Sequence, residues 1–105
     1  MNIKLIEVKS QNNELFFNIY DQDINKNIGI LFTSLNHVAY EIYPEYRGQG
    51  AATEAVKKLL ERIENPILEI TFTNIPSIKV AKKAGFTLRR IEGEFGIYEH
   101  NHLKR

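Results

Sequence analysis

The stretch of sequence that decides the fold reads Arg47-Gly48-Gln49-Gly50-Ala51-Ala52. It lies between an alternating apolar segment, 38–43, and an amphipathic segment that we expect to be a helix ending near Glu64. The first N–H groups of a helix lack partners within the helix, and the helix dipole favours negative charge there. Glycine removes the Cβ atoms that would keep a ligand away from that backbone. The junction therefore predicts a binding site for a phosphate ester.

Two common nucleotide-binding loops do not fit this stretch. A dinucleotide fingerprint needs a third small residue where Thr53 stands, and an acidic residue at the end of the next strand, whereas Glu69 lies inside it. A P-loop needs a lysine and a hydroxyl after the second glycine, and Ala51 and Ala52 supply neither. Both of these sites are excluded.

The loop instead fits the pattern Arg/Gln-x-x-Gly-x-Gly/Ala, through Arg47, Gly50 and Ala52. A later segment, 74–86, carries Asn-x-x-Ser, a short helical stretch and a Gly-Phe exit. In this order, the two segments resemble the GNAT superfamily of N-acetyltransferases over roughly residues 28–100. The later segment is similar to that of the ribosomal-protein acetyltransferase branch.

Length and composition limit the number of domains and the kinds of partner that the chain could have. The chain has 105 residues, 43% of them apolar and 26% charged, which predicts a single globular domain, 1–105. A net charge of +1 gives no general attraction to nucleic acid or to a membrane. There is no cysteine, and no segment has the length of a signal peptide or a membrane span. We expect a cytoplasmic protein without a metal, a nucleic-acid partner or a membrane partner.

The apolar pattern predicts an α+β (mixed α/β) fold with the order β-β-β-β-α-β-α-β-β. Alternation of Leu68, Ile70 and Phe72 predicts a buried strand. The short second helix has Pro76 in its first turn and either Asn74 or Ser77 as its cap. We expect strands at 3–8, 15–20, 29–33, 38–43, 68–72, 88–91 and 95–98.

The resemblance implies a GNAT-like sheet, mixed and mainly antiparallel, flanked by helices. Members of the family usually carry one or two helices between the first two strands, and only residues 9–14 separate those strands here. Those helices normally wall the acceptor side of the site. The resemblance therefore implies an intact cofactor half, with an acceptor site that is open or is completed by a second subunit of a homodimer.

The resemblance also implies acetyl-CoA as the cosubstrate. It implies that the backbone of Ile42 and Tyr43 meets the pantetheine arm, that 47–52 cradle the pyrophosphate, and that Asn74 and Ser77 touch the arm from the other side. Taken singly, these residues are better explained as a surface cation (Arg47), a helix cap (Asn74 or Ser77) and a tight turn (Gly48 and Gly50). Taken together, they favour the cofactor site. The expected cofactor-binding residues are Ile42, Tyr43, Arg47, Gly48, Gln49, Gly50, Ala51, Ala52, Asn74 and Ser77.

Candidate acid and base residues follow from the same comparison. The family often has a glutamate where His37 stands, and Glu41 shares a strand face with His37, so either side chain, or water, is a candidate base. The family's usual acidic tyrosine is replaced by Ala81, which leaves Tyr43 and Tyr98 as candidate acids. Aromatic residues on strands are more often core.

A basic cluster accompanies the second helix. It reads either as a contact for the 3′-phosphate of coenzyme A or as a solvated helix face. Its members are Lys79, Lys82, Lys83, Arg89 and Arg90.

These observations predict an N-acetyltransferase that moves acetyl from acetyl-CoA to a primary amine. Transfer is direct within a ternary complex, because no cysteine can carry the acetyl group. The alternative is a non-catalytic module that binds or senses acyl-CoA.

Overall fold

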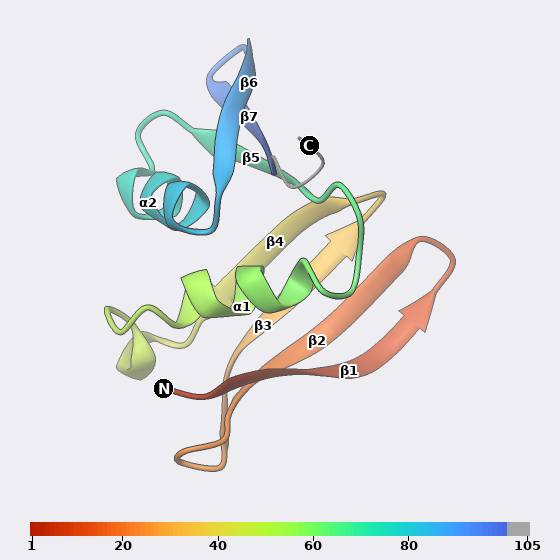
Figure 1. The fold of residues 1–105 in the computed structure, drawn as a ribbon, viewed down its shortest axis with the longest axis vertical. Coiled ribbons are helices and arrows are strands. Elements are labelled where there is room, and N and C mark those ends of the chain that lie inside the picture. The colour runs from red at the N-terminus through yellow and green to blue at the C-terminus, as the bar shows by residue number, and fades with distance from the viewer. Residues whose placement is uncertain (101–105) are drawn as a thin grey trace.

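The computed structural model describes residues 1–100, so the last five residues of the predicted domain, 101–105, lie outside it. A seven-stranded mixed sheet, mostly antiparallel, has the strand order β1-β2-β3-β4-β5-β7-β6. Helix α1 crosses one face of β1–β4, and α2 lies beside β5–β7 (Figure 1). The predicted class and order of elements are confirmed.

The first four strands form an antiparallel meander: β1 (Ile3–Gln11), β2 (Glu14–Asp21), β3 (Lys26–Ser34) and β4 (His37–Ile42). A turn of only two residues, Asn12 and Asn13, joins β1 to β2, so no helix separates them. Asn12 adopts a positive φ of 55°, which asparagine tolerates better than most residues. The missing helices leave one face of these strands without a helical cover.

A short 3₁₀ turn, Pro44–Tyr46, leads into α1 (Ala51–Leu59). The predicted helix end near Glu64 is wrong by about one turn. After Leu59 the chain tightens, and the N–H of Arg62 bonds to the Leu59 carbonyl at 2.8 Å. Ile63 still packs against the core, so the burial pattern continues beyond the helix itself.

The second half contains β5 (Ile67–Thr71), α2 (Ile75–Lys83), β6 (Phe86–Glu92) and β7 (Phe95–His100). Asn74 is the N-cap of α2, which decides between the two predicted caps. Phe72 lies after the end of β5 and is exposed, so its expected burial in that strand is wrong. The chain turns there toward α2, and alternation stops with Ile70.

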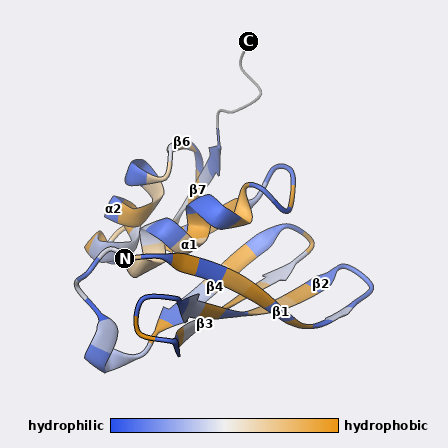
Figure 2. Cartoon of the chain, turned by 60° about the horizontal axis from the view of Figure 1, so that its bottom comes forward, coloured by the Kyte–Doolittle hydropathy of each residue, from blue (hydrophilic) through white to orange (hydrophobic). Residues whose placement is uncertain are grey.

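The two faces of β1–β4 differ. Direct cross-strand partners share a face, and one face, the helix face, buries side chains such as Phe17, Leu31 and Ile42 against α1. The opposite face, here called the bare face, carries Phe16, Ile30 and their cross-strand partners. Figure 2 shows hydrophobic residues, in orange, on β1, β2 and α1.

The sheet divides between β4 and β5. These parallel strands share one paired position, His37 with Ile67, at the start of each strand. The N–H of Ile67 also bonds to the Asn36 carbonyl at 2.8 Å. Beyond this point the strands diverge (Figure 1), which leaves one edge of β4 open.

Candidate functional site

A groove of about 820 Å³ lies on the helix face, between β4, the glycine loop and α2. Nine of its lining residues were expected from the sequence as cofactor or catalytic residues. These are Glu41, Ile42, Arg47, Gly48, Gly50, Ala51, Ala52, Asn74 and Ser77. The other lining residues are Tyr40, Tyr46, Thr53, Pro76, Lys79, Val80 and Lys83.

The open edge of β4 presents backbone groups to this groove. The N–H of Tyr43 bonds to the Ile28 carbonyl of β3 at 2.8 Å. Because hydrogen-bonded pairs alternate along an antiparallel ladder, the backbone groups of Tyr40 and Ile42 point away from β3, toward the gap. The Ile42 carbonyl accepts a hydrogen bond from Arg47 Nε at 2.7 Å. An extended ligand could pair with the remaining groups as an added strand does.

The glycine loop leaves the start of α1 free for a ligand. Gly48 and Gly50 have φ of +80° and +84°, in the left-handed region that favours glycine. A Cβ on either would meet no atom within 4 Å, so neither glycine is required by packing inside the chain. Gly50 is the N-cap of α1, and no side chain caps the helix. The first N–H groups of α1 therefore form a site suited to an anion.

Arg47 connects the loop to β4. In addition to its bond with Ile42, its guanidinium lies 3.6 Å from the Glu41 carboxylate. Both side chains are more than half exposed, so this ion pair contributes little to stability. Its effect is to hold a positive charge beside the anion site.

Helix α2 forms the opposite wall. Asn74 Oδ1 accepts from the N–H of Ser77 at 3.3 Å, which makes Asn74 a helix cap that also lines the groove. The Tyr40 hydroxyl donates to Ser77 Oγ at 3.2 Å and so bridges β4 and α2. Burial raises the pKa of Tyr40 above its ordinary value of 10.0, and the bond to Ser77 offsets part of that rise. The Tyr40 hydroxyl is therefore neutral at physiological pH.

The two candidate bases, four residues apart on β4, share one face of the strand as predicted, and that face is the bare face. His37 and Glu41 are exposed, whereas Val38, Tyr40 and Ile42 between and beyond them face the helices. His37 Nδ1 lies 2.6 Å from Glu69 Oε1, across the single paired position of β4 and β5. Glu41 also lines the groove, and His37 is not among its lining residues.

Three expected residues lie elsewhere. Tyr98 is buried in the core of the second half with Leu68 and Phe86, outside the groove. Tyr43 and Gln49 belong to the segments around the groove but do not line it.

Tyr40 was missed by the sequence reasoning. The alternation of Val38, Tyr40 and Ile42 could have placed Tyr40 on the same strand face as Ile42. The sequence could not have indicated its partner, Ser77, which is 37 residues away.

The basic cluster divides into two groups. Lys79 and Lys83, one turn apart on α2, line the groove. Arg90 on β6 pairs instead with Glu92 at 2.6 Å and lies 3.9 Å from Glu99. Of the cluster, only Lys79 and Lys83 are therefore positioned for a ligand in the groove.

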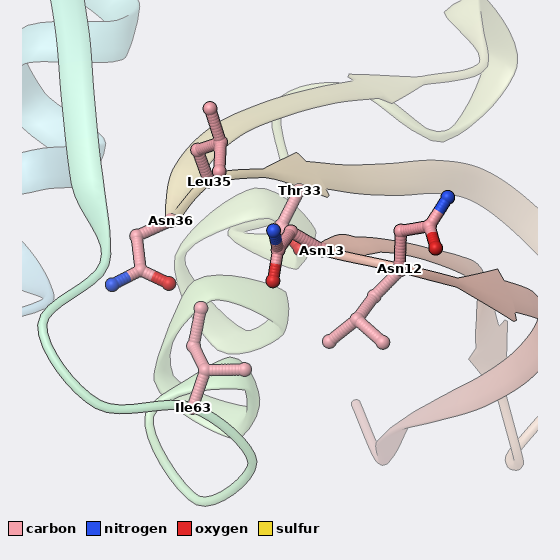
Figure 3. Close-up of a pocket in the computed structure, with 7 residues that line it drawn as sticks. Asn12, Asn13, Thr33, Leu35, Asn36 and Ile63 are labelled. Carbon is pink, nitrogen blue, oxygen red and sulfur yellow. The ribbon is translucent and has the colours of Figure 1, made fainter.

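A second hollow of about 460 Å³ lies beyond the end of α1 (Figure 3). No charged side chain lines it, and one of its amides, Asn36 Nδ2, donates to the Glu64 carbonyl at 3.2 Å. Its lining residues are Asn12, Asn13, Leu15, Thr33, Leu35, Asn36 and Ile63. This hollow lacks the anion site and the hydroxyl pair of the first.

Within residues 1–100, no group of three or more His, Cys, Asp or Glu side chains could hold a metal ion. In the same part of the chain, no helix has the length and apolarity needed to span a membrane.

Comparison with known families identifies an acetyltransferase domain. The model of the acetyltransferase (GNAT) domain matches residues 6–87. No curated protein sequence matches the chain.

Solved structures share the fold. The microcin C7 self-immunity acetyltransferase, solved with acetyl-CoA and AMP, superposes with a TM-score of 0.68 at 20% identity, over 83% of this chain and 60% of that one. The ribosomal-protein-S5-alanine acetyltransferase of Vibrio fischeri gives 0.68 at 21% identity, over 90% and 66%. Spermidine N-acetyltransferase of Vibrio cholerae, solved with CoA and spermine, gives 0.64 at 18%, over 84% and 63%. This chain thus spans less than two thirds of each of these three.

Proposed function

Because this chain belongs to the GNAT acetyltransferase family, we propose that it transfers an acetyl group from acetyl-CoA to a primary amine. One observation carries the proposal: the gap between β4 and β5 joins the groove with its anion site on the helix face to the candidate bases on the bare face, and Glu41 reaches both. A thioester held along the open edge of β4 could then meet an amine that approaches from the other face.

The groove supplies the elements that would hold acetyl-CoA. The start of α1, with Arg47 beside it, suits the pyrophosphate. The backbone groups of Tyr40 and Ile42 that remain beside the Arg47–Ile42 bond suit the amides of the pantetheine arm. Asn74 and Ser77 line the opposite side of the groove. For Ile42, Asn74, Ser77 and the loop 47–52 these are the roles that the family resemblance implies. Tyr40 takes the place of Tyr43, whose N–H is already bonded to the Ile28 carbonyl.

The chemistry needs one proton removed and one supplied. The amine nitrogen attacks the thioester carbonyl carbon, the C–S bond breaks, and coenzyme A leaves as a thiolate. His37, with Glu69 orienting its imidazole, or Glu41 takes the proton from the nitrogen, directly or through water. The resulting products are an N-acetyl amide and coenzyme A.

We further propose that the hydroxyl pair of Tyr40 and Ser77 donates the proton to the thiolate. Tyr40 is neutral at working pH and its hydroxyl bridges the groove. Of the two tyrosines expected as candidate acids, Tyr98 is buried in the core away from the groove and Tyr43 does not line it. A thiolate is also a fair leaving group, so the acid accelerates the step without being essential to it.

A non-catalytic acyl-CoA-binding module is the second candidate. The observation that favours it is Ala81, which stands where the family's acidic tyrosine is usual and is fully buried in the core. The absence of a helix between β1 and β2 points the same way, since that helix normally walls the acceptor side.

Turnover separates the two candidates. The purified chain would be mixed with acetyl-CoA and a set of amines, including peptides with free termini, lysine peptides and spermidine. Release of free thiol together with an acetylated product of the expected mass supports the transferase. Saturable acetyl-CoA binding with no acetylated product from any amine supports the binding module.

A further inference from the structure

Two lysines of α2, Lys79 and Lys83, line the groove on its helical wall. Helix α2 turns Pro76, Lys79, Val80 and Lys83 toward the groove, at the i, i+3, i+4 and i+7 spacing of a single helix face. Both lysine side chains are exposed. Within residues 1–100, neither ammonium group takes part in an ion pair, so both are available to a ligand.

The charges that line the groove are unbalanced. Four charged side chains line it: Glu41, Arg47, Lys79 and Lys83. The first two lie 3.6 Å apart and offset each other. Glu45 and Glu54, the acidic residues that flank the glycine loop, do not line the groove, and α2 itself contains no acidic residue. The lysines therefore leave two positive charges in the groove for an anionic group to neutralise.

The stability of α2 does not account for both lysines. Cations in the last turn of a helix are favourable because of the helix dipole, and that turn holds Lys82 and Lys83. Lys79 lies one turn earlier, so the dipole gives it no such role. Lysines at i and i+4 are also neighbours on the helix surface, and their like charges destabilise it slightly. An anion between Lys79 and Lys83 would remove that repulsion.

The two lysines lie apart from the proposed reaction centre. Ser77, which bonds to Tyr40 there, is in the first turn of α2. Lys83 follows six residues later, about 9 Å farther along the helix axis. The lysines are also separate from the anion site, which is formed by the start of α1 and by Arg47. They thus mark a second place for negative charge in the same groove.

The chemistry of coenzyme A supplies a group for this place. Besides the pyrophosphate, which we assign to the start of α1, the molecule carries a phosphate monoester at the 3′ position of its ribose. A phosphate monoester has a charge of about −1.5 to −2 at pH 7 and three acceptor oxygens. Lysine binds phosphate as a point charge on a flexible stem. Two lysines on neighbouring turns match the charge of one such group.

We propose that Lys79 and Lys83 bind the 3′-phosphate of acetyl-CoA, and that they make the chain select CoA thioesters over thioesters that lack this phosphate. The inference rests on the proposed function, because it needs acetyl-CoA to lie in the groove. It gives the two lysines no part in the acetyl-transfer step. Of the basic cluster, only these two residues are assigned to the phosphate.

The test compares CoA with 3′-dephospho-CoA, which keeps the pyrophosphate and the pantetheine arm. Calorimetric titration of the full chain gives the dissociation constant of each. We expect CoA to bind at least about tenfold more tightly, which is the effect of one or two hydrogen bonds to a charged group. In the double variant Lys79→Gln/Lys83→Gln, the affinity for CoA should fall to about that for dephospho-CoA, which itself should change much less.

Lys82→Gln is the matched control. Lys82 is an exposed lysine in the same helix turn as Lys83, but it does not line the groove. This variant also removes a positive charge from α2, and it should keep the preference for CoA. The preference of the wild-type chain should shrink as the salt concentration is raised, because interactions between exposed charges are screened.

Equal affinities of the wild-type chain for CoA and dephospho-CoA would overturn the proposal, and so would a preference that the double variant retains or that Lys82→Gln removes. Tighter binding of succinyl-CoA than of acetyl-CoA, lost in the double variant while dephospho-CoA binds as well as CoA, would assign the lysines to an acidic acyl group instead. These outcomes leave the proposed function standing. Binding of CoA with the expected preference but without transfer to any amine contradicts the proposed function alone, and absence of binding to either compound contradicts both.

Discussion

The two faces of β1–β4 are built from alternate residues of the same strands, and they differ in burial and in what covers them. On β2, Phe17 is 2% exposed beneath α1, whereas its neighbour Phe16 is 43% exposed on the bare face. On β4, Tyr40 and Ile42 line a groove against two helices, whereas His37 and Ala39 face outward. The helix face buries the core and lines the proposed cofactor site, and the bare face carries the candidate bases.

The largest expected effect is a difference in the free energy of unfolding between variants of two neighbouring phenylalanines, Phe17 and Phe16. Phe17→Ala removes a fully buried ring, which also lies 5.2 Å from the Arg62 guanidinium, and should lower the free energy of unfolding by about 3–5 kcal/mol. Phe16→Ala removes a half-exposed ring and should cost less than about 1 kcal/mol. Urea denaturation of both variants measures the difference. Equal losses would mean that the bare face is covered in solution.

The next effect tests the anion site on the helix face. Gly50→Glu adds a carboxylate where we expect the pyrophosphate, and should weaken acetyl-CoA binding by at least about 100-fold, or roughly 2.7 kcal/mol. Gly93→Glu is the matched control, because Gly93 also has a positive φ, of 62°, and open space around its Cβ. Calorimetric titration of both variants with acetyl-CoA should show the lower affinity in Gly50→Glu and an unchanged affinity in Gly93→Glu. Unchanged affinity in Gly50→Glu would contradict it.

The third effect belongs to the bare face. His37→Gln removes the imidazole that pairs with Glu69, and should lower kcat by about tenfold to 100-fold while acetyl-CoA affinity stays the same. Steady-state kinetics with a saturating amine measures this. Glu41→Gln is the parallel variant, and the larger of the two losses identifies the base. Full activity in both would leave neither side chain as the base.

The smallest effect concerns the hydroxyl that joins β4 to α2. Tyr40→Phe removes the donor to Ser77 and should lower kcat by about threefold to tenfold. A single-turnover experiment that follows thiol release checks this directly. A loss of acetyl-CoA affinity with kcat unchanged would show that Tyr40 only shapes the groove.

The same variant has a signature in the pH dependence of stability. The folded-state pKa of Tyr40 is raised above 10.0, so the neutral hydroxyl contributes stability below that pH, and the contribution is lost as pH rises through the folded value. The wild-type chain should therefore lose stability relative to Tyr40→Phe above about pH 10. Denaturation at several alkaline pH values measures this gap, and parallel curves would contradict the burial of that hydroxyl.

Helices and strands were predicted well where two or more local features of the sequence indicated the same boundary. The glycines and the apolar period around 47–60 both indicated a strand-to-helix junction, and Asn74, Pro76 and Gly85 bounded α2. The end of α1 was wrong because Ile63 keeps the apolar period although it belongs to a tight turn. Ile63 keeps the apolar pattern because it packs against the core, although the helix has already ended. The chain then turns toward β5, where the N–H of Ile67 bonds to the Asn36 carbonyl in the β3–β4 turn.

Contacts between distant segments could not be predicted from the sequence. The pairing of His37 with Glu69 depends on the single position where β4 and β5 meet. The bond from Tyr40 to Ser77 depends on how α2 packs across the gap. A two-residue period could assign each side chain to a face, as it did for His37 and Glu41, but it carries no information on which segment lies opposite.

The central claim is that the groove on the helix face holds acetyl-CoA. Calorimetric titration of the purified wild-type chain with acetyl-CoA tests it most directly, with CoA, ATP and NAD titrated in parallel. The account predicts saturable binding of acetyl-CoA and CoA at one site per chain, and no comparable binding of ATP or NAD. Absence of binding to both CoA species would contradict it and leave a GNAT fold without its usual ligand.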